Sequence, residues 1–578
     1  MSNIRIALCQ YNFIVGDLAG NRTKILQGVE KAVAQQCDMV VFPELSISGY
    51  PPEDLLLRRQ FIKDQMAELE HIAAQVDNIV CILGFVDQVE KELYNAAAVL
   101  HKGKISRIYH KIQLPNYSVF DEERYFEAGS EPLVVTVDDV RIGIGICEDI
   151  WVEECVTEAQ AFCGGAEVLI NISASPYYMS KFTERLQLMQ TRARRCQAAV
   201  VYTNLVGGQD ELVFDGQSLV VDETGKVLGH GFAFKEDLIL VDLDIERIQN
   251  HRAKNNFEQL AKAFNCPFEA LRYAEINGVI TPHKNKWVPE QRPRLSETDE
   301  VYLALITGLH DYVTKTGFHD VVFGLSGGID SALVAALAAD ALGPEHVHCV
   351  TLPSQFSSRG SVDDSVILAK NLGIHLEEIA IESVYHTLLD ILKPIFKDQP
   401  FNVAEENLQA RIRGAIVMAL SNKFNWMALA TGNKSEVSVG YCTIYGDMVG
   451  GFSPLKDVFK MWVYRLARRK NELAGYDVIP RSIIDKAPSA ELRPDQKDED
   501  SLPPYPVLDA ILEMYVEDDE SIDAMIHAGY DPDVVRHVVR LVDMNEYKRR
   551  QGAPGVKITP RAFGKDRRMP IVNKYRMK

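Results

Sequence analysis

The sequence predicts an α/β protein built from two successive domains. In the first half, short apolar runs alternate with helical stretches, as in proteins whose strands and helices follow one another along the chain. In the second half, strand–helix pairs repeat, as in a doubly wound parallel sheet. Near the middle, a Ser/Gly-rich turn joins an apolar run to an apolar helix. A chain of 578 residues has room for two to four domains of roughly 100–200 residues each.

The composition is that of a globular protein and argues against several functional classes. Hydrophobic residues make up 47% and charged residues 25% of the chain. The net charge of −19 argues against a nucleic-acid-binding surface, which needs clustered Lys and Arg, although it permits a nucleotide substrate. The ten cysteines contain no CxxC motif and no Cys/His pair at zinc spacing. We therefore expect neither a disulfide framework nor a structural zinc site.

The sequence also bears on cellular location. No apolar run approaches the ~20 residues that a membrane span requires. Residues 4–8 alternate between apolar and polar like a first strand, and do not read as a signal peptide. We therefore expect a cytoplasmic protein with no membrane or nucleic-acid partner.

The predicted elements of the first half follow one another in α/β order. Residues 21–36 and 60–75 have helical patterns, and residues 222–226 form the turn of a predicted hairpin between strands at 218–221 and 227–228. The other predicted strands are residues 4–8, 39–42, 79–83, 96–100, 141–146, 168–172 and 200–204.

Two of these predicted strands and a further short run end in side chains suited to catalysis. Glu44 follows the strand at 39–42, Lys111 follows a short run at 108–110, and Cys147 follows the strand at 142–146. A helix start at Cys147 would favour the thiolate, and a nearby cation would lower the thiol pKa further and hold an oxyanion. A carboxylate could move protons. Each residue alone also has an ordinary interpretation, as a buried thiol, a solvated acid or a surface lysine.

Taken together, Glu44, Lys111 and Cys147 resemble the nitrilase superfamily, which hydrolyses amides through a Cys thioester. The resemblance implies an α-β-β-α sandwich over residues 1–275. It also implies that Cys147 is the nucleophile, Glu44 the general base, and Lys111 the group that stabilises the thiol and the oxyanion.

Residues 114–126 resemble the glutamine-using branch of the same superfamily. The resemblance implies that Tyr117 contacts the substrate and that Glu122 is an auxiliary carboxylate. It further implies that Glu148 binds the amino group of glutamine.

Residues 276–298 read as a linker between the domains. The segment is polar and contains Pro282, Pro289 and Pro293. A structured strap between domains is the alternative interpretation. The second domain is predicted to occupy residues 299–578 and to open with a helix at 299–315.

The Ser/Gly-rich turn occupies residues 326–331, Ser-Gly-Gly-Ile-Asp-Ser. An apolar run at 321–323 precedes it, and an apolar, buried helix at 332–342 follows. A strand, turn and helix in this order point free backbone N–H groups at an anion. The segment is not a Walker loop, because no lysine follows the glycines.

This turn resembles the pyrophosphate loop of the N-type ATP pyrophosphatases, which split ATP between the α and β phosphates. The resemblance implies that the loop holds pyrophosphate and that Asp330 binds Mg²⁺. An ordinary Gly-rich turn is the alternative. The implied phosphate-binding residues are Ser326, Gly327, Gly328, Asp330 and Ser331.

Downstream, strand and helix patterns alternate again. Strands are predicted at 346–352, 374–381 and 426–430, and helices at 361–373, with Ser361 as its N-cap, and at 407–424. The phosphate loop follows one of the first strands. These pairs predict a doubly wound, Rossmann-like parallel sheet with its ligand at the carboxyl ends of the strands.

Four later motifs resemble one branch of the pyrophosphatases, the NAD⁺ synthetases. They lie at residues 431–436, 445–447, 453–457 and 486–492, and the resemblance spans roughly residues 300–570. It implies that Thr431 contacts ATP and that Glu436 shares Mg²⁺ with Asp330. Arg411 would lie near the adenine or ribose.

The same resemblance implies further contacts with the nucleotides. Lys460 and Ser489 would approach the phosphates, and the basic stretch that begins at Lys565 would close over the site. The acidic and proline-rich segment 495–506 reads either as a lid or as a disordered loop.

The two resemblances together imply one reaction. ATP would activate the nicotinate carboxylate of deamido-NAD⁺ as an acyl-adenylate, with Mg²⁺ as cofactor and ATP as co-substrate. Cys147 would release ammonia from glutamine, and an enclosed path would carry it to the adenylate. The products would be NAD⁺, AMP, pyrophosphate and glutamate. Members of the branch work as homo-oligomers.

Three other readings stay open at this point. An amidotransferase of the same architecture could act on a different carboxylate or nucleotide. A tRNA-modifying pyrophosphatase would need a basic face, and the net charge of −19 argues against one. A nucleotide-sensing protein with a degenerate first domain would not need Glu44, Lys111 and Cys147.

Overall fold

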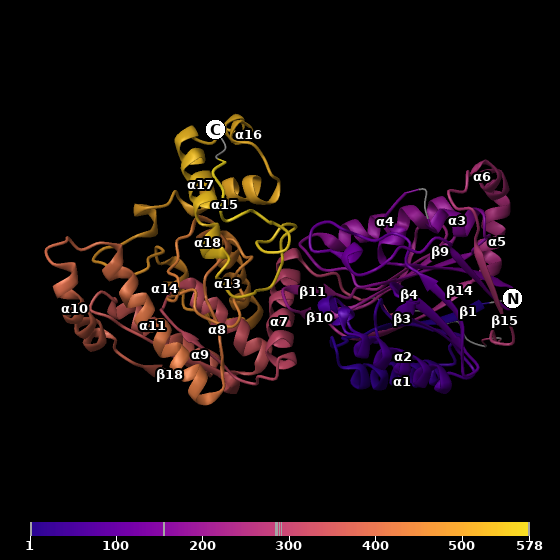
Figure 1. Ribbon diagram of the computed structural model, residues 1–578, viewed down its shortest axis with the longest axis horizontal. Coiled ribbons are helices and arrows are strands. Elements are labelled where there is room, and N and C mark those ends of the chain that lie inside the picture. The colour runs from indigo at the N-terminus through magenta and orange to yellow at the C-terminus, as the bar shows by residue number, and fades with distance from the viewer. Residues whose placement is uncertain are drawn as a thin grey trace. The chain divides into compact units, whose positions relative to one another are not determined.

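The computed structural model describes residues 3–575 except 154, 155, 282, 284–286, 288 and 291. The chain divides into two compact units (Figure 1). Unit 1 comprises Met1–Gln209 and Phe214–Leu295, and unit 2 comprises Asp210–Val213 and Ser296–Lys578. Among the described residues, no helix combines the length and the apolar character needed to cross a membrane.

Unit 1 is built on two large sheets. The first sheet has six strands in the order β14-β1-β2-β3-β4-β5, and the second has seven in the order β13-β12-β9-β8-β7-β6-β15. The first sheet consists of β1 (Asn3–Gln10), β2 (Met39–Val41), β3 (Val80–Val89), β4 (Glu92–His101), β5 (Lys104–His110) and β14 (Asp237–Asp244). The second consists of β6 (Leu133–Val137), β7 (Val140–Ile146), β8 (Val168–Ser173), β9 (Ala199–Asn204), β12 (Leu219–Val221), β13 (Val227–His230) and β15 (Arg272–Ile276). A smaller pair is formed by β10 (Val206–Gln209) and β11 (Leu212–Asp215).

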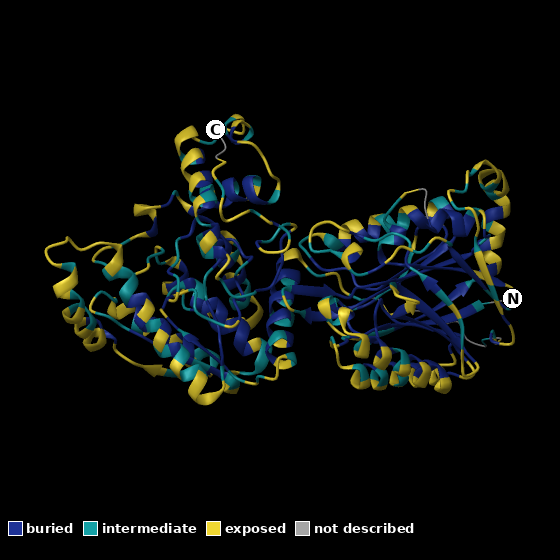
Figure 2. Ribbon diagram, viewed as in Figure 1, coloured by how far each residue is buried: buried dark blue, intermediate teal, exposed yellow. Residues whose placement is uncertain are grey.

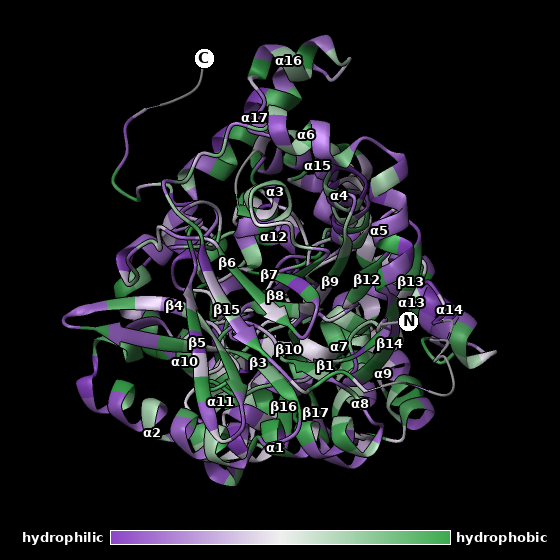
Figure 3. Ribbon diagram, turned by 90° about the vertical axis from the view of Figure 1, so that its right-hand side faces the viewer, coloured by the Kyte–Doolittle hydropathy of each residue, from purple (hydrophilic) through white to green (hydrophobic). Residues whose placement is uncertain are grey.

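Helices cover the outer faces of both sheets, which confirms the predicted α-β-β-α sandwich. The first sheet is covered by α1 and α2, and the second by α3 and α4 (Figure 1). Figure 3 shows purple and green residues interspersed along α2, as expected of a helix with one apolar face. The helices of unit 1 are α1 (Leu18–Ala34), α2 (Arg59–Gln75), α3 (Val156–Phe162), α4 (Lys181–Cys196), α5 (Ile245–Lys254) and α6 (Phe257–Ala263).

The core of unit 1 lies between the sheets. Alternate residues of each strand point into it, for example Ile6 and Leu8 of β1 and Ile142 and Ile144 of β7. Figure 2 shows these strands buried, while α1 and α2 expose their outer faces. The ends of the strands are therefore held by a packed core, and side chains that follow them are well positioned.

The described residues near the end of unit 1 are hydrogen-bonded to the rest of that unit. His283 Nε2 lies 2.8 Å from an oxygen of Asp38, and the Trp287 backbone N–H donates to Asp242 at 2.6 Å. The predicted linker residue Pro282 lies outside the described residues. The boundaries at 275/276 and 298/299 stay predictions, although β15 ends at Ile276 and α7 (Glu297–Lys315) follows.

Unit 2 contains a four-stranded sheet in the order β18-β17-β16-β19, and all of its strand pairs are parallel. This confirms the predicted parallel-sheet domain. Val322 and Val350 pack with Tyr385 and Ile412 of two covering helices. The elements are β16 (Val321–Gly324), α8 (Ile329–Leu342), β17 (Val347–Thr351), α9 (Arg359–Leu372), β18 (His375–Glu378), α10 (Glu382–Phe396), α11 (Val403–Phe424), β19 (Met427–Ala428), α12 (Lys434–Val439), α13 (Lys460–Ala474) and α14 (Arg481–Asp485).

One helix start differs from the prediction. The N-cap of α9 is Ser358, whose hydroxyl accepts the Ser361 backbone N–H at 3.2 Å, so the predicted N-cap Ser361 was wrong. The Ser361 hydroxyl instead donates to Glu491 at 2.8 Å. Both serines can cap a helix, and both also donate to Glu491, so the cap is identified by the bond from the Ser361 N–H to the Ser358 hydroxyl.

A helical cluster completes unit 2. Its apolar side chains, among them Leu508, Val516 and Val538, form a buried core of their own. Its helices are α15 (Tyr505–Leu512), α16 (Ile522–His527), α17 (Pro532–Met544) and α18 (Glu546–Arg549).

Candidate active sites

The nucleophile candidate sits on a strained turn in unit 1. β7 ends at Ile146, and Cys147 opens a short 3₁₀ turn, η3 (Cys147–Ile150). The backbone φ of Cys147 is 43°, in the left-handed region that residues other than glycine rarely adopt. Such strain persists only where the surroundings enforce it, and it concentrates at functional sites. The side chain is 3% exposed.

The structure brings the predicted partners of Cys147 into one buried cluster. Lys111 Nζ donates to Glu44 at 2.8 Å and to both oxygens of Glu122 at 2.8 and 2.9 Å. Glu44 is further held by the Asn95 side chain at 2.7 Å and by the Ala174 backbone N–H at 2.8 Å. Removing either charged partner would leave the other buried without compensation, which costs several kcal/mol.

The electrostatics of the cluster fix its resting protonation. Burial, reinforced by Glu44, raises the pKa of the Cys147 thiol well above its usual range, although Lys111 opposes this. Burial alone would lower the Lys111 pKa, but Glu122 and Glu44 raise it well above its ordinary value. The resting cluster therefore pairs a neutral thiol with an ammonium. Burial and the Glu44 charge thus act against the thiolate that a helix start would favour.

Burial shifts the titration of Glu122 toward neutral pH. Burial raises its pKa to about 7, against the lowering effect of Lys111, and Glu44 adds repulsion. The Tyr50 hydroxyl donates to it at 3.2 Å. The auxiliary carboxylate thus contacts the same ammonium as Glu44.

Tyr117 and Glu148 also meet, as the predicted glutamine contacts would require. The Tyr117 hydroxyl donates to both Glu148 oxygens at 3.1 Å, and Tyr117 is 56% exposed. Burial raises the pKa of Glu148.

One residue of this region was missed by the sequence reasoning. Lys181 places its ammonium 3.9 Å from the centre of the Trp151 ring and interacts electrostatically with Cys147 and Glu148. Burial lowers its pKa. Because Lys181 is simply the first residue of an amphipathic helix, no local pattern distinguishes it.

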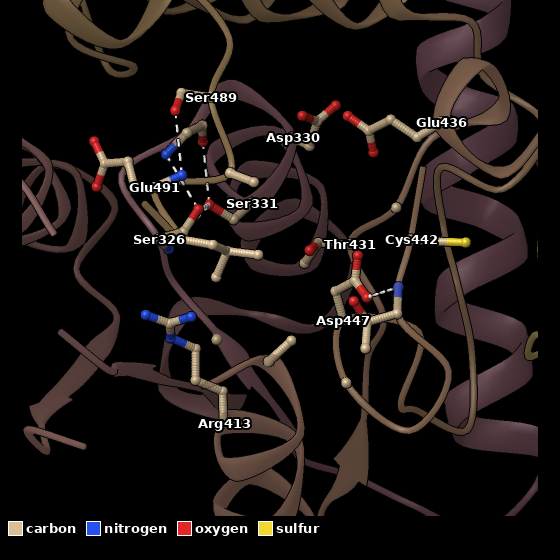
Figure 4. Close-up of a pocket in the computed structure, with 18 of the residues that line it drawn as sticks. Ser326, Asp330, Ser331, Arg413, Thr431, Glu436, Cys442, Asp447, Ser489 and Glu491 are labelled. Atoms are coloured by element: carbon tan, nitrogen blue, oxygen red, sulfur yellow. Dashed lines mark hydrogen bonds between the residues drawn. The ribbon is translucent and has the colours of Figure 1, made fainter. Parts of the chain in front are cut away.

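In unit 2, a cavity of about 450 Å³ opens at the carboxyl ends of the strands. Its volume falls within the range of small-molecule sites. Its wall includes Arg413, which the sequence reasoning did not select (Figure 4). The predicted site residues that line it are Ser326, Gly328, Asp330, Ser331, Thr431, Glu436, Lys460 and Ser489.

The predicted phosphate loop forms one wall of this cavity. The Ser326 and Ser331 hydroxyls lie 3.1 Å apart, and the Gly328 N–H donates to Ser326 at 3.2 Å. Gly327 has a φ of 76°, and a Cβ there would lie 2.2 Å from the Ser361 carbonyl oxygen. Gly328 caps α8 without a side chain, so the first N–H groups of this helix are available to an anion.

The carboxylates of Asp330 and Glu436 and the ammonium of Lys460 lie beside the loop. Lys460 Nζ contacts Asp330 at 2.5 Å and Glu436 at 3.1 Å, and Asn433 donates to Asp330 at 2.8 Å. Burial raises the Glu436 pKa to about 8, against Lys460 and with repulsion from Asp330. Figure 4 shows the two carboxylates pointing toward one another across the cavity wall.

This donor set fits Mg²⁺ bound together with a phosphate. Mg²⁺ is usually held by one or two carboxylates, with phosphate oxygens and water completing its shell. Among the residues described, no group of three or more His, Cys, Asp or Glu side chains could hold a metal alone. Asp330 and Glu436 supply the two carboxylates but not a complete cage.

Three predicted nucleotide contacts are not among the residues that line the cavity: Gly327, Arg411 and Lys565. Arg411 donates to the Ile444 carbonyl at 3.3 Å instead. Arg413 lines the wall, with its Nε bound to the Leu352 carbonyl at 3.0 Å. Residues two apart on a helix point in nearly opposite directions, so only one of the two arginines can face the ligand.

The segment 495–506 contributes to the same wall. Gln496 and Asp498 line the cavity, and Asp498 is 4% exposed. The Tyr505 hydroxyl donates to Asp498 at 2.8 Å, and the Asp498 N–H donates to the Pro488 carbonyl at 3.1 Å. The Ser489 hydroxyl donates to the Gln496 carbonyl at 2.6 Å.

The comparisons with known proteins match both halves of the chain. The carbon-nitrogen hydrolase model matches residues 5–253, and the NAD synthase model matches residues 301–552. A glutamine-dependent NAD⁺ synthetase of Thermotoga maritima is 44% identical over 578 residues, 100% of each chain.

Two solved structures are similar over nearly the whole chain. That of a glutamine-dependent NAD⁺ synthetase from Acinetobacter baumannii in complex with ADP has a TM-score of 0.76 at 40% identity and covers 100% of each chain. That of a glutamine-dependent NAD⁺ synthetase from Cytophaga hutchinsonii has a TM-score of 0.80 at 22% identity, covering 99% and 98%, and supports the fold. The full-length match, together with a buried Cys–Glu–Lys cluster and a phosphate-loop cavity, shows that this chain belongs to the glutamine-dependent NAD⁺ synthetases.

Proposed function

We propose that the chain converts deamido-NAD⁺ to NAD⁺ with ATP, taking its nitrogen from glutamine at the Cys147 cluster. The observation that supports this proposal is that one chain holds both a buried Cys–Glu–Lys cluster and a phosphate-loop cavity. Lys111 joins Glu44 and Glu122 beside Cys147. The loop from Ser326 to Ser331 opens into a nucleotide-sized cavity.

In the first centre, Glu44 takes the proton of the neutral Cys147 thiol as the sulfur attacks the side-chain carbonyl of glutamine. Lys111 stabilises the oxyanion. The C–N bond then breaks, and Glu44 returns the proton to the leaving ammonia. Water hydrolyses the remaining thioester to glutamate, again with Glu44 as base.

The rim residues supply charges for the free amino acid. Glu148, held by Tyr117, would bind the ammonium group of glutamine. Lys181 carries the opposite charge beside Glu148 and would bind the carboxylate. A negative and a positive side chain placed for the ammonium and carboxylate on the α-carbon of glutamine select a free amino acid over a simple amide.

In the second centre, the nicotinate carboxylate attacks the α-phosphorus of ATP, and the bond to the β-phosphate breaks. The N–H groups of the Ser326–Ser331 loop and of α8 receive the leaving pyrophosphate. Asp330 and Glu436 would hold Mg²⁺, whose charge offsets that of the phosphates. Ammonia then attacks the acyl-adenylate carbonyl, and AMP leaves.

The nitrogen must reach the adenylate as ammonia. In bulk water near neutral pH it is mostly ammonium, which has no free electron pair. We infer that it passes between the centres within the protein, which also protects the adenylate from water. A cytoplasmic location and a homo-oligomeric state belong to the same proposal.

ATP-dependent formation of NAD⁺ from deamido-NAD⁺, with glutamine or ammonium as alternative donors, tests the proposal. We expect both donors to work and AMP to accumulate with NAD⁺ one to one. Activity on another carboxylate or nucleotide, but not on deamido-NAD⁺, would show a different acceptor.

A further inference from the structure

The Asp149 carboxylate lies fully buried between two catalytic segments of unit 1, and no step above uses it. Its exposure is 0%. Four donors surround it: the Tyr109 hydroxyl at 2.7 Å and the backbone N–H groups of Ile112, Gln113 and Ile146 at 3.1, 2.9 and 2.9 Å. An ionised carboxylate only accepts hydrogen bonds, so all four donors can be satisfied together.

The two oxygens face different segments. Oδ1 accepts from Ile112 and Gln113, which directly follow Lys111. Oδ2 accepts from Ile146, which directly precedes Cys147, and from Tyr109 at the end of β5. One side chain thus joins the backbone beside the ammonium to the backbone beside the thiol.

Other contacts hold each segment separately. The Lys111 N–H donates to the Asn95 carbonyl at 2.8 Å, which fixes it to β4 of the first sheet. The Cys147 carbonyl accepts from Asn171 at 3.4 Å, which fixes it to β8 of the second sheet. Asp149 bridges the two sheets at the point where these catalytic residues meet.

We propose that Asp149 is a positioning residue that sets the distance between Lys111 and Cys147 during glutamine cleavage. It contacts neither the substrate nor the reacting atoms, and acts by fixing the backbone of both residues. The proposal rests on the proposed function of the Cys147 cluster. A misplacement of about 1 Å in such a site costs roughly 100-fold in rate.

The first test is Asp149→Asn in the full chain. The substitution replaces one carboxylate oxygen with an NH₂ group, which would face two of the four N–H or O–H donors. The backbone segment that carries those donors must therefore shift. We expect kcat for glutamine-dependent NAD⁺ formation to fall about 100-fold, with KM for glutamine changed less than about twofold. Ammonium-dependent NAD⁺ formation should stay within about twofold of wild type.

Asp138→Asn is the matched control. Asp138 also accepts three backbone N–H groups, from Gly278, Val279 and Ile280 at 2.6, 3.1 and 2.7 Å, but lies at the opposite end of β7. It should leave both nitrogen routes within about twofold. Equal loss of the two routes in Asp149→Asn, or the same loss in Asp138→Asn, would overturn the proposal.

A second measurement keeps the proposal testable if Asp149→Asn does not fold. Tyr109→Phe removes one donor and leaves the carboxylate in place, so we expect a smaller fall in kcat, about 3- to 10-fold. The rate of Cys147 alkylation by iodoacetamide, followed on its own peptide, should fall in both variants because Lys111 supports the thiolate less well. Unchanged alkylation and kcat in Tyr109→Phe would refute it.

The two proposals fail differently. If the wild-type chain makes NAD⁺ from ammonium but not from glutamine, the proposed function of the Cys147 cluster fails. In that case, the rate of Cys147 alkylation still shows whether Asp149 sets the position of Lys111.

Discussion

At the scale of the residue, the first centre is governed by protonation. Cys147 rests as a neutral thiol because burial and Glu44 raise its pKa, so a base must remove the proton as the sulfur attacks. The residue types and their order along the chain were predictable from the sequence. The resting charges were not, because they depend on burial that only the folded unit creates.

Cys147→Ala should abolish glutamine-dependent NAD⁺ formation and leave the ammonium-dependent rate within about twofold. Alanine removes the nucleophile but no partner of the buried ion pairs. Both rates are measured with saturating ATP and deamido-NAD⁺. Cys163→Ala, at an exposed cysteine of the same unit, is the control and should alter neither rate. Glutamine-dependent turnover in Cys147→Ala would assign the nucleophile elsewhere.

The glutaminase rate should fall as the pH drops through about 7. Burial raises the Glu122 pKa to about 7, so the carboxylate gains a proton below that pH and loses part of its hold on Lys111. In Glu122→Gln this limb of the pH–rate profile of glutamine hydrolysis should vanish and the rate at high pH should be lower. An unchanged pH–rate profile in Glu122→Gln would show that Glu122 does not cause the low-pH limb.

At the scale of the element, the strand–loop–helix unit β16–α8 carries the second centre. Its apolar strand, its glycines and its apolar helix were predicted from local pattern alone, because each has a local cause. The first residue of α9 was not predicted, because Ser358 and Ser361 are both suitable N-caps and the local sequence does not distinguish them. Arg413 was missed for the same reason: the face that α11 turns to the cavity is a tertiary property.

Gly327→Ala should lower NAD⁺ formation from both nitrogen sources by at least about tenfold. A Cβ at this position would meet the Ser361 carbonyl at 2.2 Å, so the phosphate loop must move. Gly475→Ala is the matched control, because its φ is also 76° but no atom lies within 4 Å of the added Cβ. We expect it to cost about 1 kcal/mol of unfolding free energy and no activity. Equal kinetic effects of the two substitutions would contradict a role for the loop.

At the scale of the whole molecule, the chain combines two catalysts with separate cores. The parallel sheet was predicted because strands and helices alternate along the sequence, and the α-β-β-α sandwich because Glu44, Lys111 and Cys147 resemble the nitrilase superfamily. Strand β14 was not predicted. Its eight residues pair with β1, more than 200 positions earlier in the chain, and no local sequence signal indicates that pairing. The helical cluster of α15–α18 was likewise not anticipated.

Asp330→Asn should stop NAD⁺ formation from glutamine and from ammonium alike, by at least about 100-fold. It removes one of the two carboxylates that would hold Mg²⁺ and leaves Lys460 with a single acidic partner. Asp340→Asn, on the same helix but paired with Lys470 outside the cavity, should keep both rates. Each rate is followed by NAD⁺ release. Retention of either route in Asp330→Asn would exclude it from the nucleotide site.

Helix α8 leaves almost none of its surface to solvent, with every residue from Ser331 to Ala339 buried. A helix packed in this way cannot shift to accommodate a ligand, so the proposed pyrophosphate site would already be formed before a nucleotide binds. Every nucleoside triphosphate would meet the same phosphate-binding groups. Selectivity for adenine over other bases must therefore come from the opposite walls of the cavity. There, side chains of α11 and residues 486–492 can change without disturbing the core.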